Sequence, residues 1–173
     1  MPKDPKWGKN WETPDGVDFG KLRWDLKWIS DTLATAEYMP DELWAADENV
    51  VQRGQAGRWL PSDCVVVIVE GFLLFFDKPV CDMFHSHIWV EADCDTCLLR
   101  RHNRGRGSRK RDVEASADWF RGQVWAHHEE NRGRQLANAK AALRMEGAIS
   151  KQKLADKATV HCKQLLREFV AMR

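Results

Sequence analysis

The chain has 173 residues, of which 43% are hydrophobic and 31% charged. This length favours a single domain over residues 1–173, and the apolar content excludes a wholly disordered chain. The formal net charge of +1 excludes a general attraction to nucleic acid or membranes, and the longest apolar stretch, Val65–Phe76, is too short to cross a bilayer.

The N-terminal 16 residues are polar, rich in proline and glycine, and lack the apolar stretch of a signal peptide, so we expect an irregular segment. Asp18 is a typical helix N-cap, and apolar residues recur behind it at helical spacing to about Ala36. They predict an amphipathic helix. Residues 37–63 predict a long connection with a short helical turn near Asp41–Ala46.

The stretch Val65–Phe76, VVVIVEGFLLFF, is the strongest strand signal in the chain. Its five consecutive β-branched residues are typical of a strand buried on both faces, which we expect at about Cys64–Val69. Glu70 follows directly. Open α/β sheets bind ligands at the carboxyl ends of their strands, so Glu70 is a candidate functional residue. The alternative is an acid hydrogen-bonded to nearby backbone.

The rest of the chain alternates helices and strands. In order we expect a loop or short helix at Gly71–Phe76 closed by Asp77-Lys78-Pro79, a strand at His87–Glu91, a helix capped by Asp93 or Asp95 that reaches Arg104, a mobile loop at Gly105–Ser116, a helix from Trp119 to Ala142, a strand at Leu143–Met145 and a helix at Lys151–Met172. Strands separated by helices predict parallel β-α-β units, and so an α/β fold with a parallel sheet and flanking helices.

Several of these segments carry a family resemblance. IVEGFLLF, Lys78-Pro79, the following strand and CLLRRHNR are together similar to the nicotinamide riboside kinases, in the uridine kinase-like branch of the P-loop nucleoside kinases. Residues 10–18 (NWETPDGVD) resemble the element that enters a helix after the substrate-contacting acid, and Asp118–Trp125 resembles the aromatic helix after the lid. The resemblance implies transfer of the ATP γ-phosphoryl group to a ribonucleoside 5′-hydroxyl with Mg²⁺, in NAD salvage.

Two motifs of that family are absent from the sequence. One is G-x-x-x-x-G-K-[ST], which holds the triphosphate, and the other is the Asp-Asp-aromatic element of the next strand. We therefore expect an N-terminally truncated kinase-like sheet, without its first strand and Walker A loop, and with little or no kinase activity. A truncated gene model, a fragment and a degenerate paralogue all remain compatible with this pattern.

The resemblance assigns roles to three residues before the lid. Glu70 is implied beside the reacting phosphate as a ligand of Mg²⁺, which prefers carboxylate oxygens. Trp11 is implied to stack on the nicotinamide or base, and Glu12 to accept the ribose hydroxyls, although the family usually has Asp there. The alternative is a loop acid in solvent and a tryptophan packed on the helix.

Three arginines belong to a lid region of about residues 100–118. Arg100 and Arg104 are implied to reach phosphates, and Arg101 and Arg104 to act in catalysis, with Arg101 also contacting the nucleoside. The alternative is a solvated helix end whose cations complement the helix dipole. Arg106 stands where the family's lid has an aromatic, so one wall of the base pocket is missing.

Other clusters and functions stay open. The block Arg104–Arg111 is compatible with a lid, a solvated run of charges, a localisation-like patch or an arm that binds nucleic acid. No aromatic residue lies within the block, which argues against binding of single-stranded nucleic acid. Cys94 and Cys97 are read as ordinary thiols, and five cysteines outside any regular framework indicate a reduced, cytoplasmic protein. Residues 127–130 (HHEE) are read as a solvated helix face. One competing function is a non-catalytic paralogue that binds a nucleoside or protein, or associates through an uncovered sheet edge. The other is nucleic-acid binding through Arg100–Arg111.

Overall fold

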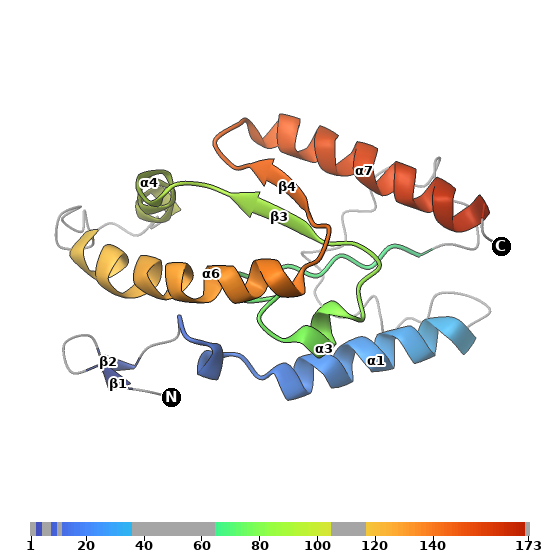
Figure 1. The fold of residues 1–173 in the computed structure, drawn as a ribbon, viewed down its shortest axis with the longest axis horizontal. Helices are drawn as coiled ribbons and strands as arrows, with labels where there is room; N and C mark the ends of the chain where they lie inside the picture. The colour runs from blue at the N-terminus through green and yellow to red at the C-terminus, as the bar shows by residue number, and fades with distance from the viewer. Residues whose placement is uncertain (1–2, 5–7, 10–11, 36–64, 105–116, 172–173) are drawn as a thin grey trace.

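A computed structural model describes residues 3–4, 8–9, 12–35, 65–104 and 117–171 (Figure 1). The elements in chain order are β1 (Lys3–Asp4), β2 (Gly8–Lys9), the 3-10 turn η1 (Pro14–Gly16), α1 (Phe19–Thr35), α3 (Lys78–Cys81), β3 (Ile88–Glu91), α4 (Cys94–Arg104), the π-helical segment η3 (Phe120–Trp125), α6 (Ala126–Asn138), β4 (Leu143–Glu146) and α7 (Lys151–Ala171).

Strands β3 and β4 form a small parallel sheet. Their register pairs Ile88 with Leu143 and Glu91 with Glu146. Parallel neighbours need a crossover connection, and here α4, η3 and α6 provide it. This confirms the predicted combination of a parallel sheet with helices between its strands.

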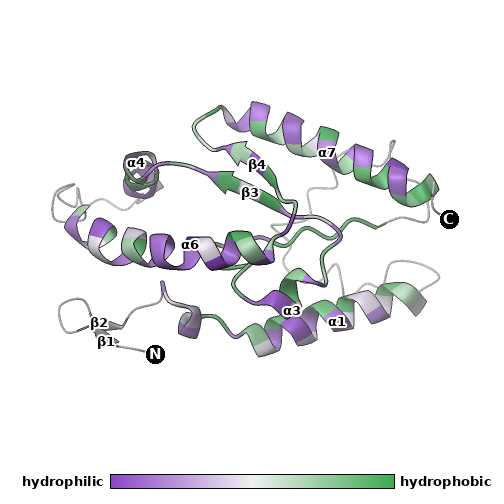
Figure 2. Ribbon diagram, in the orientation of Figure 1, coloured by the Kyte–Doolittle hydropathy of each residue, from purple (hydrophilic) through white to green (hydrophobic). Residues whose placement is uncertain are grey.

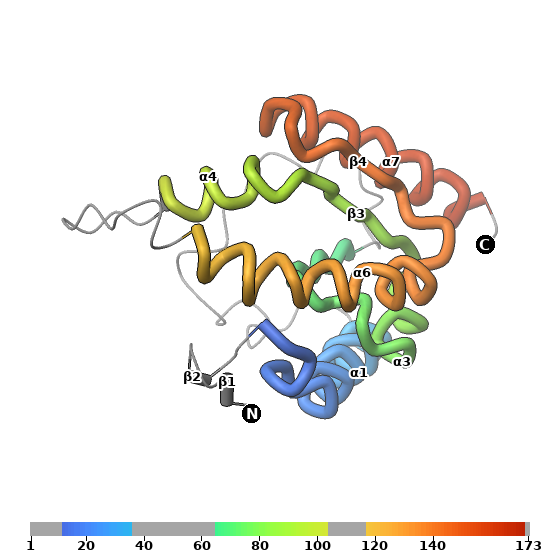
Figure 3. Tube along the Cα trace, turned by 60° about the vertical axis from the view of Figure 1, so that its left-hand side comes forward, coloured from blue at the N-terminus to red at the C-terminus, as the bar shows by residue number. Residues whose placement is uncertain are grey.

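The helices lie on different sides of this strand pair (Figures 1 and 3). α1 and α3 lie together on one side, where the Phe19 and Phe76 rings stack with centroids 5.9 Å apart. α7 lies on the opposite side, beside β4. The His161 ring there shares a 2.8 Å hydrogen bond with Ser86. Figure 2 shows mostly hydrophobic residues along β3, and hydrophobic and hydrophilic residues that alternate along the helices.

Two of the predicted helix caps are confirmed. The backbone N–H of Lys21 donates to Asp18 Oδ1 over 2.8 Å at the start of α1. Asp93 accepts from the backbone N–H of Thr96 over 2.8 Å and from its hydroxyl over 2.7 Å at the start of α4. A carboxylate at the N-cap satisfies amide groups that have no partner inside the helix, which is why both helices begin where the sequence predicts.

The strand predicted at about Cys64–Val69 is wrong over the described residues 65–69. They form no strand, and Val65 and Ile68 are 49% and 84% exposed. Figures 1 and 3 place the segment on the side of β3 away from β4. Among the described residues, no backbone group pairs with residues 65–70. β-Branched residues favour an extended chain, but only a neighbouring strand supplies hydrogen bonds and burial.

Two further predictions need correction. The N-terminal segment expected to be irregular contains the short antiparallel pair β1–β2. The helix expected to reach Ala142 ends at Asn138, and Ala141 takes a left-handed φ of 55° before β4 begins. The alanine-rich sequence contains no helix breaker, so the ending comes from the pairing of β4 with β3. The turn near Asp41–Ala46 and the loop Gly105–Ser116 lie outside the described residues.

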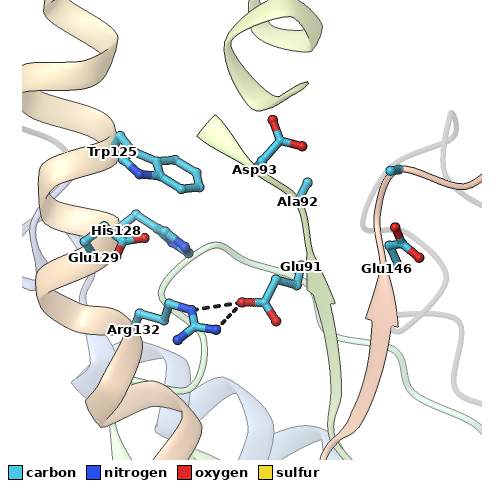
Figure 4. Close-up of a pocket in the computed structure, with 9 residues that line it drawn as sticks. Glu91, Ala92, Asp93, Trp125, His128, Glu129, Arg132 and Glu146 are labelled. Atoms are coloured by element: carbon cyan, nitrogen blue, oxygen red, sulfur yellow. Dashed lines mark hydrogen bonds and ion pairs between the residues drawn. The ribbon is translucent and has the colours of Figure 1, made fainter. Parts of the chain in front are cut away.

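Among the described residues, two small clusters of buried side chains contribute to the core. The first gathers Phe75, Cys81, Trp89 and Ala139 between β3 and the end of α6. The second gathers Leu98, Ala117 and Phe120 between α4 and the start of η3. Together they fix the helix running from Ala117 to Asn138 at both ends, and its middle faces the carboxyl ends of β3 and β4 (Figure 4).

Candidate functional site

The carboxyl ends of β3 and β4 are held together by the turn after β4. The backbone N–H of Gly147 donates to the carbonyl oxygen of Glu91 over 2.5 Å. Arg100 Nη2 donates to the Gly147 carbonyl oxygen, also over 2.5 Å. A Cβ on Gly147 would lie 3.0 Å from the Glu91 oxygen, so this approach needs glycine. The ends of parallel strands are where α/β sheets bind ligands.

A cavity of about 430 Å³ opens between these strand ends and α6 (Figure 4). Its lining residues are Glu91, Ala92, Asp93, Trp125, His128, Glu129, Arg132, Glu146 and Ala148. Figure 4 shows the Trp125 and His128 rings projecting from the helix toward the end of β3. Arg132 meets Glu91, with its Nε donating to Oε1 over 3.0 Å and its Nη2 donating to the same oxygen. Arg132 is therefore already paired with a carboxylate.

One wall of the cavity is aromatic. The rings of Trp125 and His128 have centroids 4.8 Å apart, and His128 stacks on Trp89 at 6.2 Å. Burial lowers the pKa of His128 below its ordinary value, with Arg132 adding to the effect and Glu129 and Glu91 opposing it. The imidazole is therefore mostly neutral at pH 7, and it contributes a flat surface without a charge.

A second cluster joins segments far apart in the sequence. Arg101 Nη2 donates to Glu12 Oε1 over 2.9 Å, and the Glu12 side chain is only 14% exposed. The guanidinium carbon of Arg101 lies 4.9 Å from the centre of the Trp119 ring. The structure thus brings together two residues that the sequence selected, Glu12 and Arg101, and adds an aromatic that it did not select for this role.

Of the other selected residues, Glu70 and Arg100 are described and are not joined to this cluster. Glu70 is exposed and follows the segment that forms no strand. Arg100 points to the turn at Gly147. The side chain of Arg104 and the whole of Trp11 lie outside the described residues. The phosphate-reaching role of the lid arginines therefore stays a prediction.

The implied Mg²⁺ does not fit the residues that the structure describes. Those residues contain no group of three or more His, Cys, Asp or Glu side chains that could hold a metal. Glu70 alone, exposed on an irregular segment, does not provide the several oxygen ligands from the protein and phosphates that hold Mg²⁺.

Sequence reasoning missed the residues of the cavity. It assigned His127, His128, Glu129 and Glu130 to a solvated face, which holds for the exposed Glu129 and Glu130 but is wrong for His128. The signal was present, because Trp125, His128 and Arg132 recur at spacings of three and four residues and so share a helix face. Among the described residues, Cys94 and Cys97 form no disulfide, and neither do Cys81 and Cys162. No described helix is long and apolar enough to cross a membrane.

Comparison with known proteins finds relatives over most of the chain. The model of the phosphoribulokinase / uridine kinase family matches residues 32–144. The uridine kinase of Halobacterium salinarum is 27% identical over 129 residues, which cover 75% of this chain and 54% of that protein. Human nicotinamide riboside kinase 2 is 27% identical over 137 residues, covering 78% and 56%. The chain thus spans about half the length of these two relatives. No solved structure matches.

Proposed function

The chain belongs to the phosphoribulokinase / uridine kinase family, and from this membership we propose that it binds a ribonucleoside. The family consists of ATP-using kinases that generally act with Mg²⁺. Its members' reaction on a nucleoside is transfer of a phosphoryl group to the 5′-hydroxyl. Nicotinamide riboside is our leading nucleoside, because of the IVEGFLLF and CLLRRHNR segments, and uridine is the second.

The cluster of Glu12, Arg101 and Trp119 is the observation that supports nucleoside binding. Glu12 is a partly buried carboxylate that accepts a hydrogen bond from Arg101, and a carboxylate is an acceptor suited to the hydroxyls of a ribose. Trp119 offers a flat aromatic surface within reach of the same arginine. We propose that the ribose lies at Glu12 and the base against Trp119. Trp119 would then supply the aromatic surface that the family's lid has at the position of Arg106.

We propose further that these 173 residues bind the nucleoside with little phosphoryl transfer. Their sequence contains no G-x-x-x-x-G-K-[ST] motif, and in this class of enzyme that loop and the metal do much of the charge stabilisation. The roles of Arg100 and Arg104 toward phosphate stay proposals, and Glu70, a carboxylate, would need a metal ion to act on phosphate.

Calorimetric titration of the chain with nicotinamide riboside and with uridine tests the binding. We expect three variants, Arg101→Ala, Glu12→Gln and Trp119→Leu, each to lower the affinity for the preferred nucleoside by about tenfold. Each removes a charged hydrogen bond or a stacking surface. Arg167→Ala and Trp24→Leu, at exposed positions on α7 and α1, are matched controls that should bind as the unmodified chain does. Absence of binding by either nucleoside, or equal affinity in all variants, would contradict the proposal.

A second candidate function rests on the exposed apolar segment Val65–Ile68. Unpaired extended segments with β-branched residues add to strands of other chains. We propose as the alternative a non-catalytic protein that self-associates there. Light scattering should then detect a dimer that Val67→Lys dissociates and that Val160→Lys, on exposed α7, leaves intact. A monomeric unmodified chain would exclude it. The other alternative, nucleic-acid binding through Arg100–Arg111, depends on a basic block of which residues 105–111 lie outside the described residues.

A further inference from the structure

The cavity at the strand ends is lined by none of the residues proposed for the nucleoside. We propose that it is a separate binding site for a planar organic cation, such as an aromatic ring that carries an amidinium group. This inference goes beyond the proposed function and does not depend on it. It rests on the charge, the aromatic wall and the size of the cavity.

The charge of the lining is negative. Four of the nine lining residues are carboxylates (Glu91, Asp93, Glu129 and Glu146), against one arginine. Arg132 is neutralised by its two hydrogen bonds to Glu91, so it offers little to an anion. Asp93 accepts two hydrogen bonds from Thr96, which stabilise its charged form. Asp93, Glu129 and Glu146 therefore leave an excess of negative charge that favours a cation.

The shape of the lining suits a flat ring. Trp125, at the end of η3, and His128, on α6, project side by side toward the cavity (Figure 4). An indole face attracts a cation placed over it, and the neutral imidazole does not oppose that attraction. The cavity of about 430 Å³ matches a ligand of one or two rings. The ligand would stack on this wall with its N–H groups toward the carboxylates at the ends of β3 and β4.

A metal ion is a poorer occupant of the same cavity. The described residues contain no group of three potential ligands close enough to coordinate one. Carboxylates spread around a cavity instead suit an extended cation that contacts them one at a time through separate donors.

Benzamidine and benzamide are matched probes because they share size and planarity but differ in charge. In calorimetric titrations at pH 7 we expect benzamidine to bind about tenfold more tightly than benzamide, the range of a cation–aromatic contact together with an ion pair. Trp125→Leu should lower the affinity for benzamidine by about tenfold, because the aromatic ring is lost. Glu146→Gln should weaken it by about threefold and leave benzamide unchanged.

The controls are Trp24→Leu and Glu168→Gln, which remove an exposed tryptophan and an exposed carboxylate elsewhere. Equal affinity for the two probes, or equal loss in the controls, would overturn the proposal. If Trp125→Leu does not fold, the Trp125 indole N–H resonance of the unmodified chain must shift with benzamidine and not with benzamide. The same Trp125→Leu and Glu146→Gln variants should bind uridine, an uncharged nucleoside, normally. Loss of uridine binding in both would show one site rather than two.

Discussion

The backbone N–H of Gly147 meets the carbonyl oxygen of Glu91 at 2.5 Å, and this contact closes the ends of β3 and β4. A side chain at position 147 would also lie 3.2 Å from Ala92 Cβ and from Val90 Cγ1. The Glu91 oxygen is a backbone atom and the Ala92 Cβ is bonded directly to the backbone, so no side-chain rotation can move either atom away. The strand ends that border the cavity are therefore held by a residue without a side chain.

Gly147→Ala should lower the free energy of unfolding by about 1–3 kcal/mol, the usual cost of forcing an extra methyl group into a packed region. Gly133→Ala is the matched control, because a Cβ at that position on α6 meets nothing within 4 Å. It should raise stability by about 0.5–1 kcal/mol through helix propensity. Urea unfolding followed by circular dichroism measures both, and a Gly147→Ala variant as stable as Gly133→Ala would contradict the close approach.

Stability should fall as the pH drops below about 6.5, the ordinary pKa of histidine. Burial lowers the pKa of His128 in the folded chain, so the unfolded chain takes up the proton first and is favoured in acid. The groups around the imidazole are Trp125 and Trp89, the carboxylates of Glu129 and Glu91, and Arg132.

Comparison of urea midpoints at pH 7.5 and 5.5 for the unmodified chain and for His128→Phe isolates this effect. Phenylalanine keeps a flat ring but does not titrate, so the variant should lose less stability between the two pH values. An identical loss in both proteins would assign the pH dependence to other groups.

Asp93→Ala should lower the stability of the chain, because it removes the N-cap of α4. Asp95→Ala removes a neighbouring acid whose ion pair with Arg121 is exposed, so a smaller loss of stability is expected. Thermal unfolding of the two variants side by side measures the difference. If Asp95→Ala proved the more damaging, the cap would not be what starts this helix.

Local signals predicted the helices well. The caps at Asp18 and Asp93 and the apolar periodicity behind them fix where α1 and α4 begin, since both act within a few residues. The strands at 88–91 and 143–146 were also predicted, and pairing with each other supplies their hydrogen bonds. The segment 65–69 has stronger strand character than either, yet a strand depends on a neighbour that its own sequence does not contain.

The site was only partly predictable, for the same reason. Glu12 and Arg101 were selected separately, on a family pattern, and their contact across 89 positions is a property of the fold. His128 was assigned to solvent because residues 127–130 cannot all face one ligand on a helix and lack the H-E-x-x-H spacing of a metal site. What determines its environment is Trp89, on a strand that precedes it by 39 positions.

The π-helical segment Phe120–Trp125 affects more than local geometry. It separates Trp119, at the proposed nucleoside cluster, from Trp125, at the cavity wall, within one continuous helical run. A π turn accommodates an extra residue, and one residue corresponds to about 100° of rotation in a regular α-helix. Removing one residue would turn the whole face of Trp125, His128 and Arg132 relative to Trp119. Homologues that differ in length there would carry one of the two surfaces but not both.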